Sequence, residues 1–504
     1  MAATDRTTLK GYFNTGDVPT QSNFGDLIDS FSRNLVFDVR DYGAVGDGST
    51  DNTTAIQNAI NAAAGSGTGW NGAGAGTITG GGIVYFPPGT YLTGQLVMAN
   101  FVTLQGSGQR STTIKLKNAA NVDLIINHVS TNGTTDPNAE YCTIRDLTLD
   151  GNKTNQTGTS RGIFFNTNPL WTAATNDYDF DTHHQVSNVL IYNCHDDGFA
   201  ANGRADHYLS NVEAYYCNGN GFSPSTDTTM VGCVAGQSGL NGFNVQTPAI
   251  RLWGCKAFYS GQVTVSGSSG NGLYVVYSHG GCEAVGFEAQ DNRAAGINIS
   301  TSESVRILAT LDSNSTSGSG AYPGIDLWQI TNSIIEIVAF ERKANGSTSY
   351  QANAIRIRGN SADNHIVVTH NAENGAVIQN EFMTGSSTLG NEIIVKSIGG
   401  VQTGTYAASY TPDFRNGGTI LLTLTGAITI NAPAVDIFSV STAYAGMPRV
   451  SFVFTQDATG GRVVTWNAVY KTNWTPDTTA NKTNTITFAY DGTNFIQVGA
   501  SISI

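Results

Sequence analysis

The sequence predicts an all-β fold, a solenoid in which short strands stack coil upon coil. Glycine accounts for 59 of the 504 residues, only 12% of the residues are charged, and Asn, Thr and Ser are abundant. Helical proteins of this size carry more Lys, Glu and Leu, because these residues stabilise solvent-exposed helices. A chain rich in Gly, Asn, Thr and Val instead indicates many short strands joined by tight turns.

A repeat of roughly 20–25 residues in the middle of the chain supports the solenoid. Each repeat places Gly before an apolar residue; these anchors are Phe199, Phe222, Phe243, Leu273, Ile297 and Ile325. Upstream of the anchors lie pairs of small or apolar residues at period 2, as the inward positions of a strand require. We expect one inward column formed by Val189/Ile191, Val212/Ala214, Cys233/Ala235, Cys255/Ala257 and Cys282/Ala284.

The six cysteines are predicted to be core residues. None of them forms a CxxC pair, so neither a metal site nor a disulfide framework is indicated. We expect all the thiols to be free and buried. They are Cys142, Cys194, Cys217, Cys233, Cys255 and Cys282.

The net charge of −13 argues against nucleic acid as a partner. Phosphate neutralisation requires clusters of Lys and Arg, which the sequence lacks, whereas a glycan remains compatible. The sequence shows no apolar signal-peptide core and no run of about 18 apolar residues. We therefore expect no membrane insertion, and synthesis in a cytoplasm without classical export.

Residues 37–91 carry a distinctive series of motifs. DYGAVGDG at 41–48 leads into a short amphipathic helix at 54–60, and GIVYFPPGTY follows at 82–91. This combination resembles the opening segment of the pectate-lyase-like β-helix superfamily, as found in phage tail spikes and depolymerases. Residues 9–21 also resemble the N-terminus of a tail fibre.

The resemblance implies a right-handed parallel β-helix, a homotrimer and a location in the virion tail. We expect an N-terminal anchoring segment at 1–35, with one helical pattern at 23–31, that binds the phage tail, its baseplate or another tail fibre. The β-helix should occupy 36–405. Alternating apolar residues beyond it predict a C-terminal antiparallel, sandwich-like β module at 406–504. This module resembles the C-terminal modules of tail fibres, which implies a role in trimerisation or carbohydrate binding.

The residues between the inward pairs form an outward column: Leu190, Glu213, Val234, Lys256, Glu283, Arg306 and Glu336. The last four alternate in charge, which favours a structural salt-bridge ladder along the coils. Glu213 differs, because Leu190 and Val234 flank it. A carboxyl group among apolar neighbours tends to have a raised pKa, as a general acid requires. The alternative is a solvated surface glutamate.

Further candidates surround Glu213. Tyr192 and Tyr215 fall on adjacent coils, where their rings would lie against sugar faces, or else form trimer contacts. The insertion at 167–185 carries Trp171, Asp179, Asp181 and His183, and the next coil carries Arg204, Asp206 and His207. Because rigid scaffolds bear binding groups on loops, we expect the glycan groove at this corner. Any single loop aspartate is equally explained as a turn-former.

Residues 193–200 contain a second candidate. Asp196 and Asp197 resemble the paired aspartates of polygalacturonase-like hydrolases, although the Gly-His-Gly of that family is Gly219-Asn220-Gly221 here. Asp197 also shares a column with Asn220, Asn241 and Asn271, which favours a rung of an amide ladder.

We expect hydrolysis of a capsule, O-antigen or exopolysaccharide, with Glu213 and either Asp179 or Asp181 as the acid/base pair. Asp196 and Asp206 are the reserve candidates. Two carboxyl groups about 5–5.5 Å apart give retention and about 6.5–9.5 Å inversion, and the sequence does not choose between them. A uronate lyase using Arg204, His207 or Tyr215 is the alternative. Hydrolysis requires no cofactor, whereas a lyase would fit Ca²⁺. A non-enzymatic receptor-binding fibre is the third hypothesis.

Overall fold

The computed structural model of the chain describes residues 6–16, 18–31, 36–64, 81–127, 139–166, 183–203, 206–317, 321–340, 354–371, 378–381, 392–398, 401–412, 414, 418–433, 449–491 and 493–501. Two short helices, α1 (Arg6–Gly11) and α2 (Gln21–Phe31), open the chain. The helix expected at 23–31 lies within α2, whereas α1 was not predicted. The two helices contact each other through the rings of Phe13 and Phe24, whose centroids are 5.7 Å apart.

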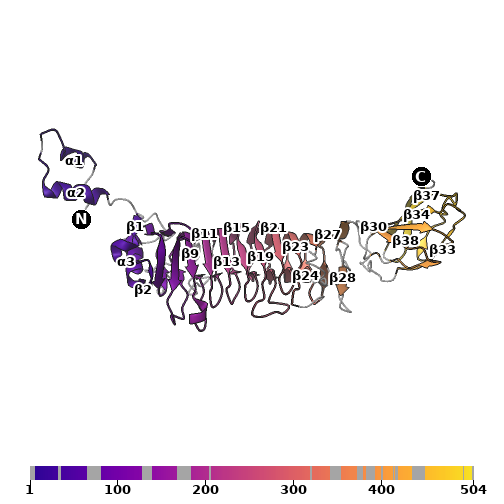
Figure 1. Cartoon of the computed structure of the whole chain (residues 1–504), viewed down its shortest axis with the longest axis horizontal. Coiled ribbons are helices and arrows are strands. Elements are labelled where there is room, and N and C mark those ends of the chain that lie inside the picture. Colours follow the sequence, from indigo (N-terminus) through magenta and orange to yellow (C-terminus); the bar gives the residue numbers. More distant parts are fainter. Residues whose placement is uncertain are drawn as a thin grey trace, which may run out of the picture.

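A long parallel β-helix follows, with its coils stacked along the longest axis of the molecule (Figure 1). Among the described residues its strands form one 18-stranded and one 11-stranded sheet. The larger sheet contains β1 (Val36–Asp38), β2 (Asp47–Asp51), β3 (Gly82–Phe86), β4 (Gly89–Thr93), β6 (Val102–Gly106), β7 (Thr112–Leu116), β9 (Thr143–Asp150), β11 (Gln185–Tyr192), β13 (Tyr208–Tyr215), β15 (Thr229–Val231), β16 (Val234–Gly236), β18 (Ile250–Trp253), β19 (Lys256–Phe258), β21 (Cys282–Gln290), β23 (Arg306–Asp312), β25 (Ile334–Phe340), β27 (His365–Asn371) and β29 (Glu392–Ile398).

The smaller sheet carries the predicted anchors. It contains β5 (Leu96–Met98), β8 (Ile125–Asn127), β10 (Ile163–Phe165), β12 (Phe199–Ala201), β14 (Phe222–Ser223), β17 (Phe243–Val245), β20 (Leu273–Val276), β22 (Ile297–Glu303), β24 (Ile325–Thr331), β26 (Ile355–Arg358) and β28 (Ile378–Glu381). Phe199, Phe222, Phe243, Leu273, Ile297 and Ile325 pair in succession across it. The repeat therefore predicted this register correctly.

The first coil is closed by helix α3 (Thr53–Ala64), which follows the short 3-10 helix η1 (Val39–Tyr42). Ile56, Ala59, Ile60 and Ala63 are buried, so the predicted amphipathic helix is present. It packs against β1, β3 and β5 at the N-terminal end of the solenoid (Figure 1).

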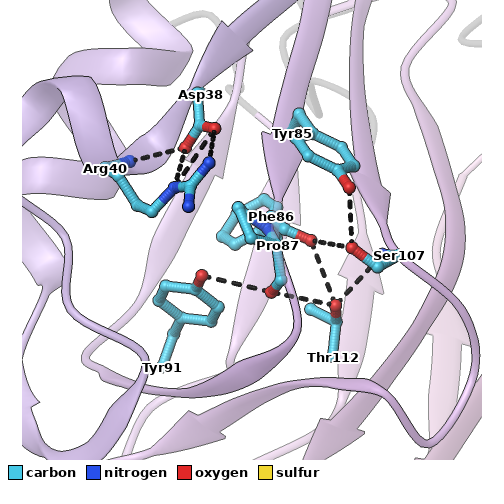
Figure 2. Close-up of polar contacts among 8 residues, drawn as sticks. All are labelled: Asp38, Arg40, Tyr85, Phe86, Pro87, Tyr91, Ser107 and Thr112. Carbon is cyan, nitrogen blue, oxygen red and sulfur yellow. Dashed lines mark hydrogen bonds and ion pairs between the residues drawn. The ribbon is translucent and has the colours of Figure 1, made fainter.

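The FPPGTY motif forms a turn whose carbonyl groups are bound by side chains (Figure 2). Proline lacks an N–H and breaks regular strand pairing, so the turn's carbonyls need other donors. The hydroxyl of Thr112 donates to the carbonyls of Phe86 (3.0 Å) and Pro87 (3.2 Å), and Tyr91 also donates to Pro87 (3.1 Å). Ser107 donates to Phe86 (3.1 Å). These contacts join the motif to the next coil.

The inward column departs from prediction at one coil. Ala214, Ala235 and Ala257 pair in succession, as expected, but Ala257 then pairs with Ala289 rather than Ala284. Cys282 instead pairs with Ile250. The prediction failed because each of these coils has two strand segments separated by a sharp corner, and Cys282 begins the first segment whereas Cys255 begins the second.

The same error breaks the predicted salt-bridge ladder. Lys256 pairs with Glu288 (2.9 Å), and Glu283 pairs separately with Arg306 (2.6 Å). Glu336 lies beside Leu308. Two independent ion pairs thus replace the single alternating column. All six cysteines are buried and free, as predicted.

Downstream of the β-helix, the described residues form a module with its own apolar core. Its strands are β30 (Val401–Gly404), β31 (Ser409–Tyr410), β32 (Thr419–Leu424), β33 (Ile428–Ile430), β34 (Arg449–Gln456), β35 (Val464–Trp466), β36 (Tyr470–Lys471), β37 (Thr483–Tyr490) and β38 (Phe495–Ser501). The module has a six-stranded mixed sheet and a three-stranded parallel sheet rather than the expected antiparallel strands. β30, β32 and β34 pair in parallel, and only β34–β37 and β37–β38 pair antiparallel among the described strands. Alternating apolar residues cannot distinguish these cases, because the side-chain period is the same in both. The domain boundaries at residues 35 and 405 stay predictions.

Candidate functional site

A polar and aromatic cluster lies on the outward face of the larger sheet. Lys115, Asp150, Tyr192 and Tyr215 pair in succession on β7, β9, β11 and β13. Neighbouring strands are about 4.8 Å apart, so these four side chains form one column. Of the four, the sequence singled out only the two tyrosines.

Asp150 organises one half of the cluster. It is only 4% exposed and accepts hydrogen bonds from the Tyr192 hydroxyl (3.0 Å), the Asn193 side-chain amide (3.0 Å) and the Asn152 backbone N–H (2.8 Å). The Lys115 ammonium lies 3.6 Å from its second oxygen. A carboxylate with this many donors is held in one position, so it orients Tyr192 and Lys115 instead of reaching toward a substrate.

The Tyr192 phenol consequently stays protonated at neutral pH. Burial, with the nearby negative charge of Asp150 and the hydrogen bond to it, raises the pKa of Tyr192 to about 12. The group can donate a hydrogen bond but is a weak proton acceptor.

Glu213 and Tyr215 form the other half of the cluster. Glu213 pairs with Leu190 on one side and Val234 on the other, as the sequence predicted, and its side chain is half-buried. Burial raises the pKa of Tyr215, and the charge of Glu213 and a hydrogen bond to it add to the rise. Arg110 lies near enough to oppose that shift. Its backbone N–H donates to the Thr148 hydroxyl (3.1 Å), which fixes the turn beside the cluster.

Asp197 occupies a structural position. Its carboxylate accepts hydrogen bonds from the backbone N–H of Asn220 (2.6 Å) and from that residue's side-chain amide (3.1 Å). Asn220 in turn accepts from Asn241, and Asn241 from Asn271, so the amide ladder considered in the sequence is present. Burial raises the pKa of Asp197. Asp196 lies in the same turn, and a Cβ at Gly219 would meet its Oδ1 at 2.7 Å.

His183 and Asp206 lie at the other end of the same strands. Their side chains are 3.5 Å apart, so these two residues meet at one corner. β11 is eight residues long, so this corner is roughly 20 Å from Tyr192 along the strand. The residues expected to line one groove thus lie at opposite ends of β11 and β13, with His183 and Asp206 at one end and Tyr192 and Tyr215 at the other.

His207 is in the interior and does not line a groove. It is 1% exposed, and its ring stacks on that of His184 at 5.2 Å. His184 accepts a hydrogen bond from the Cys142 backbone N–H (3.2 Å), and burial, with the neighbouring histidine charges, holds its pKa well below the usual value. Side chains alternate between inward and outward along a strand, and Leu209 points inward. The same alternation, continued to the residue before Tyr208, makes His207 inward, and the sequence prediction did not continue it that far.

Trp171, Asp179, Asp181 and Arg204 lie outside the described residues. Sequence reasoning missed Lys115, Asp150 and Arg110, although stacking β9 under β11 would have placed Asp150 beside Tyr192. No group of three or more His, Cys, Asp or Glu suited to a metal occurs in the described part of the chain. Within those same ranges, no helix is long and apolar enough to span a membrane.

The chain matches two family models. Residues 36–278 match "Rhamnogalacturonase A/epimerase, pectate lyase-like", and residues 410–495 match "Putative phage tail fibre C-terminal domain". The β-helix is thus similar to the pectate-lyase-like family over residues 36–278, and the C-terminal module is similar to a tail-fibre C-terminal domain over residues 410–495. The predicted resemblance to pectate-lyase-like phage tail spikes is confirmed.

The relatives of the β-helix include Mannuronan C5-epimerase AlgE4 of Azotobacter vinelandii. The two sequences are 33% identical over 196 residues, which cover 34% of this chain and 32% of that protein. Alginate lyase 7 of the same organism is 33% identical over 194 residues, 33% of this chain and 21% of that protein. The chain therefore spans a third or less of these curated relatives.

Two solved structures share the fold. The A-module of the A. vinelandii epimerase AlgE6 superimposes with a TM-score of 0.51 at 19% identity, covering 71% of this chain and 99% of that one. Tailspike protein 2 of the Escherichia coli O157:H7 bacteriophage CAB120 gives a TM-score of 0.53 at 16% identity, covering 71% of this chain and 46% of that one.

Proposed function

We propose that this chain is a phage tail-spike subunit that binds and cleaves a bacterial surface polysaccharide. The single observation that carries the proposal is the cluster on β7, β9, β11 and β13, where Glu213 faces outward beside Tyr215 and next to a fixed Lys115–Asp150–Tyr192 network. A rigid face with aligned acid, phenol and cation groups suits an extended glycan. The pectate-lyase-like relatives support a polysaccharide as the substrate class.

For hydrolysis, Glu213 acts as the general acid. Asp150 is unsuited to be its partner because its oxygens are already bound by four groups. Asp179 or Asp181, from the insertion before β11, is the second carboxyl group in this proposal. Both lie outside the described residues, and because the insertion joins β11 at the corner far from Tyr192, this pairing requires the insertion to reach along the strand toward Glu213. The separation of the two carboxyl groups then decides between retention and inversion.

The second candidate is β-elimination on a uronate-containing glycan. Arg110 and Lys115 offer positive charge for the uronate carboxylate. In this alternative the Tyr215 oxygen takes the proton beside that carboxylate while the phenolic proton of Tyr215 passes to Glu213, and the leaving oxygen takes a proton from water. Relatives named as a mannuronan epimerase and an alginate lyase favour a uronate. No cofactor is proposed for hydrolysis; for elimination, Ca²⁺ is the cofactor to test by adding a chelator.

Size-exclusion chromatography after incubation with purified capsule, O-antigen or alginate tests the proposal. We expect shorter products, and we expect Glu213→Gln to lower kcat by about 100-fold or more. Glu303→Gln, at an exposed glutamate on the smaller sheet, is the matched control. A rise in ultraviolet absorbance from unsaturated uronates would select elimination. Tight binding of a polymer that stays intact would overturn the enzyme proposal in favour of a receptor-binding fibre.

In this proposal the chain is a homotrimer in the virion tail, acting at the bacterial surface. The N-terminal helices α1 and α2 attach it to the tail, its baseplate or another fibre. The tail-fibre match of residues 410–495 supports that location.

A further inference from the structure

Aromatic side chains continue from the candidate site along the axis of the β-helix. Tyr215 on β13, Gly236 on β16 and Phe258 on β19 occupy one outward column in three successive coils. The rings of Tyr215 and Phe258 nevertheless approach to 5.9 Å between centroids, although a whole coil lies between them. The two rings therefore lean toward each other over the intervening coil.

Gly236 makes this approach possible. A Cβ at this position would lie 2.3 Å from Cδ1 and Cε1 of Tyr215 and 2.7 Å from Cζ of Phe258. The space above the glycine is thus filled from both sides by the two rings. Gly236 is not among the glycines with positive φ, so the backbone does not require glycine here. The requirement comes from the rings.

Two more tyrosines border the same column. Tyr216 and Tyr259 follow Tyr215 and Phe258 at the corner of their coils, with φ of 57° and 52°. They are 53% and 43% exposed. A left-handed backbone is unfavourable for a side chain with a Cβ, and the equivalent corner of a neighbouring coil carries Asn193, which tolerates it. The fold alone does not call for tyrosine at these two corners.

We propose that Tyr215, Tyr216, Phe258 and Tyr259, here called the aromatic platform, bind a second stretch of the polysaccharide, which runs parallel to the helix axis. The inference rests on the proposed function and extends it beyond the cleavage site. Coils repeat about every 4.8 Å, close to the length of one pyranose in an extended chain, so the platform reaches two coils beyond Tyr215. Sugar rings present C–H faces that stack on aromatic rings.

Electrostatics distinguish the platform from the cleavage site. Lys256, beside Phe258, is held by Glu288 (2.9 Å) and Gln290 (2.8 Å), so its charge is already compensated. Binding on the platform should consequently depend on ring contact and respond weakly to salt. Binding beside Arg110 and Lys115 should weaken as ionic strength rises if the glycan is acidic.

Alanine substitutions at the far end of the platform test the inference. With a polymer that the wild-type chain cleaves, Phe258→Ala and Tyr259→Ala should raise KM about threefold to tenfold and leave kcat within about twofold. Cleavage of the shortest fragment that is still a substrate should not change, because such a fragment does not reach the platform. Tyr277→Ala is the matched control, since Tyr277 has a φ of 55° and is 64% exposed but follows a strand of the smaller sheet.

A glycine pair adds a second, independent test. Gly236→Ala should raise KM for the polymer, because its Cβ would lie 2.3 Å from Cδ1 and Cε1 of Tyr215 and 2.7 Å from Cζ of Phe258 and would push both rings aside. Because Tyr215 also contacts Glu213, kcat should fall in this variant, unlike in Phe258→Ala. Gly267→Ala is its control, since a Cβ there meets nothing within 4 Å. Circular dichroism and melting temperature confirm that both variants are folded.

The possible results separate the two proposals. If the wild type cleaves polymer and the platform variants keep its KM, the platform inference is wrong and the proposed function stands. If Tyr259→Ala instead changes the mass measured by light scattering, the platform is a contact between copies of the chain, and the inference is overturned. If the wild type neither binds nor cleaves any surface polysaccharide or alginate, both proposals fail together.

Discussion

The carboxylates of the candidate site differ in how many donors hold them. Asp150 is buried and bound by four groups, and Asp197 is bound within the amide ladder. Glu213, on the outward face of β13 two residues before Tyr215, is half-buried between Leu190 and Val234. Residue type alone does not separate these roles, because the difference lies in the donors that other coils contribute.

Replacing Asp150 by Asn should destabilise the fold. The amide can accept at only one of the two oxygen positions. Either Tyr192 and Lys115, which share Oδ2, or Asn152 and Asn193, which share Oδ1, therefore lose their acceptor, at a cost of about 1–3 kcal/mol. Urea denaturation measures the change. Glu303→Gln, at an exposed ion pair of 3.6 Å, should change stability by less than about 0.5 kcal/mol. Equal stability of the two variants would contradict the structural role assigned to Asp150.

The buried His184 should make the fold sensitive to acid. Burial holds its folded pKa well below the usual histidine value of about 6.5, so the unfolded state binds the proton first as pH falls. Stability is therefore full above about pH 6.5 and decreases below it, by up to about 1.4 kcal/mol per pH unit for this one group. His184→Asn should reduce that slope, whereas replacing the exposed His279 by Gln should not. The slope is measured by urea denaturation between pH 5 and pH 8, and an unchanged slope in His184→Asn would refute the prediction.

At the scale of elements, a repeated corner shapes each coil of the larger sheet. Asp146, Asn188, Asn211, Gly232, Gly254 and Gly286 all have positive φ and lie between the two segments of their coils. Asn, Asp and Gly adopt this conformation at low cost, whereas residues with bulky Cβ groups do not. The corner explains why Cys255 and Cys282 were wrongly assigned to one column. Each coil has two strand segments, so a small residue before an alternating pattern can mark the start of either segment.

Asn211 provides the test of the corner. Asn211→Val should lower the free energy of unfolding by about 1–2 kcal/mol, because a β-branched residue is strained at its φ of 51°. Asn211→Gly should stay within about 0.5 kcal/mol of the wild type. Thermal melting of both variants checks this, and Thr229→Val, in the adjacent strand, is the control. A Val variant as stable as the Gly variant would exclude strain at this corner.

At the scale of the whole molecule, the residues that the structure describes form two separate apolar cores, one running through the β-helix and one in the C-terminal module. The long coil stack gives the candidate site and the aromatic platform a common straight face (Figure 1). A trimer would bring three such faces to a single receptor-bearing surface. Three weak contacts with one polymer then act as a multivalent bond.

The trimer proposal predicts a definite mass. Light scattering of the full chain should give three times 53.0 kDa, independent of concentration over the micromolar range. Tyr277→Ala and Gly267→Ala should leave that mass unchanged. A mass of one chain under these conditions would contradict the assembly expected for a tail spike.

The sequence by itself determined the solenoid, its register on the smaller sheet, the buried cysteines, the amphipathic helix at its start and the neighbours of Glu213. Each of these depends on a short period that apolar residues and glycines repeat directly. Only the tertiary structure decided which acids face outward and which are held inside, because that depends on contacts between residues such as Asp150 and Tyr192, 42 positions apart. It also decided that His207 is interior, that the charge ladder is split, and that Tyr215 and Phe258 meet over Gly236. The number of residues in a loop or corner can vary between coils without changing the repeat. Sequence spacing therefore does not fix which residues of neighbouring coils lie side by side, and the packing of the coils does.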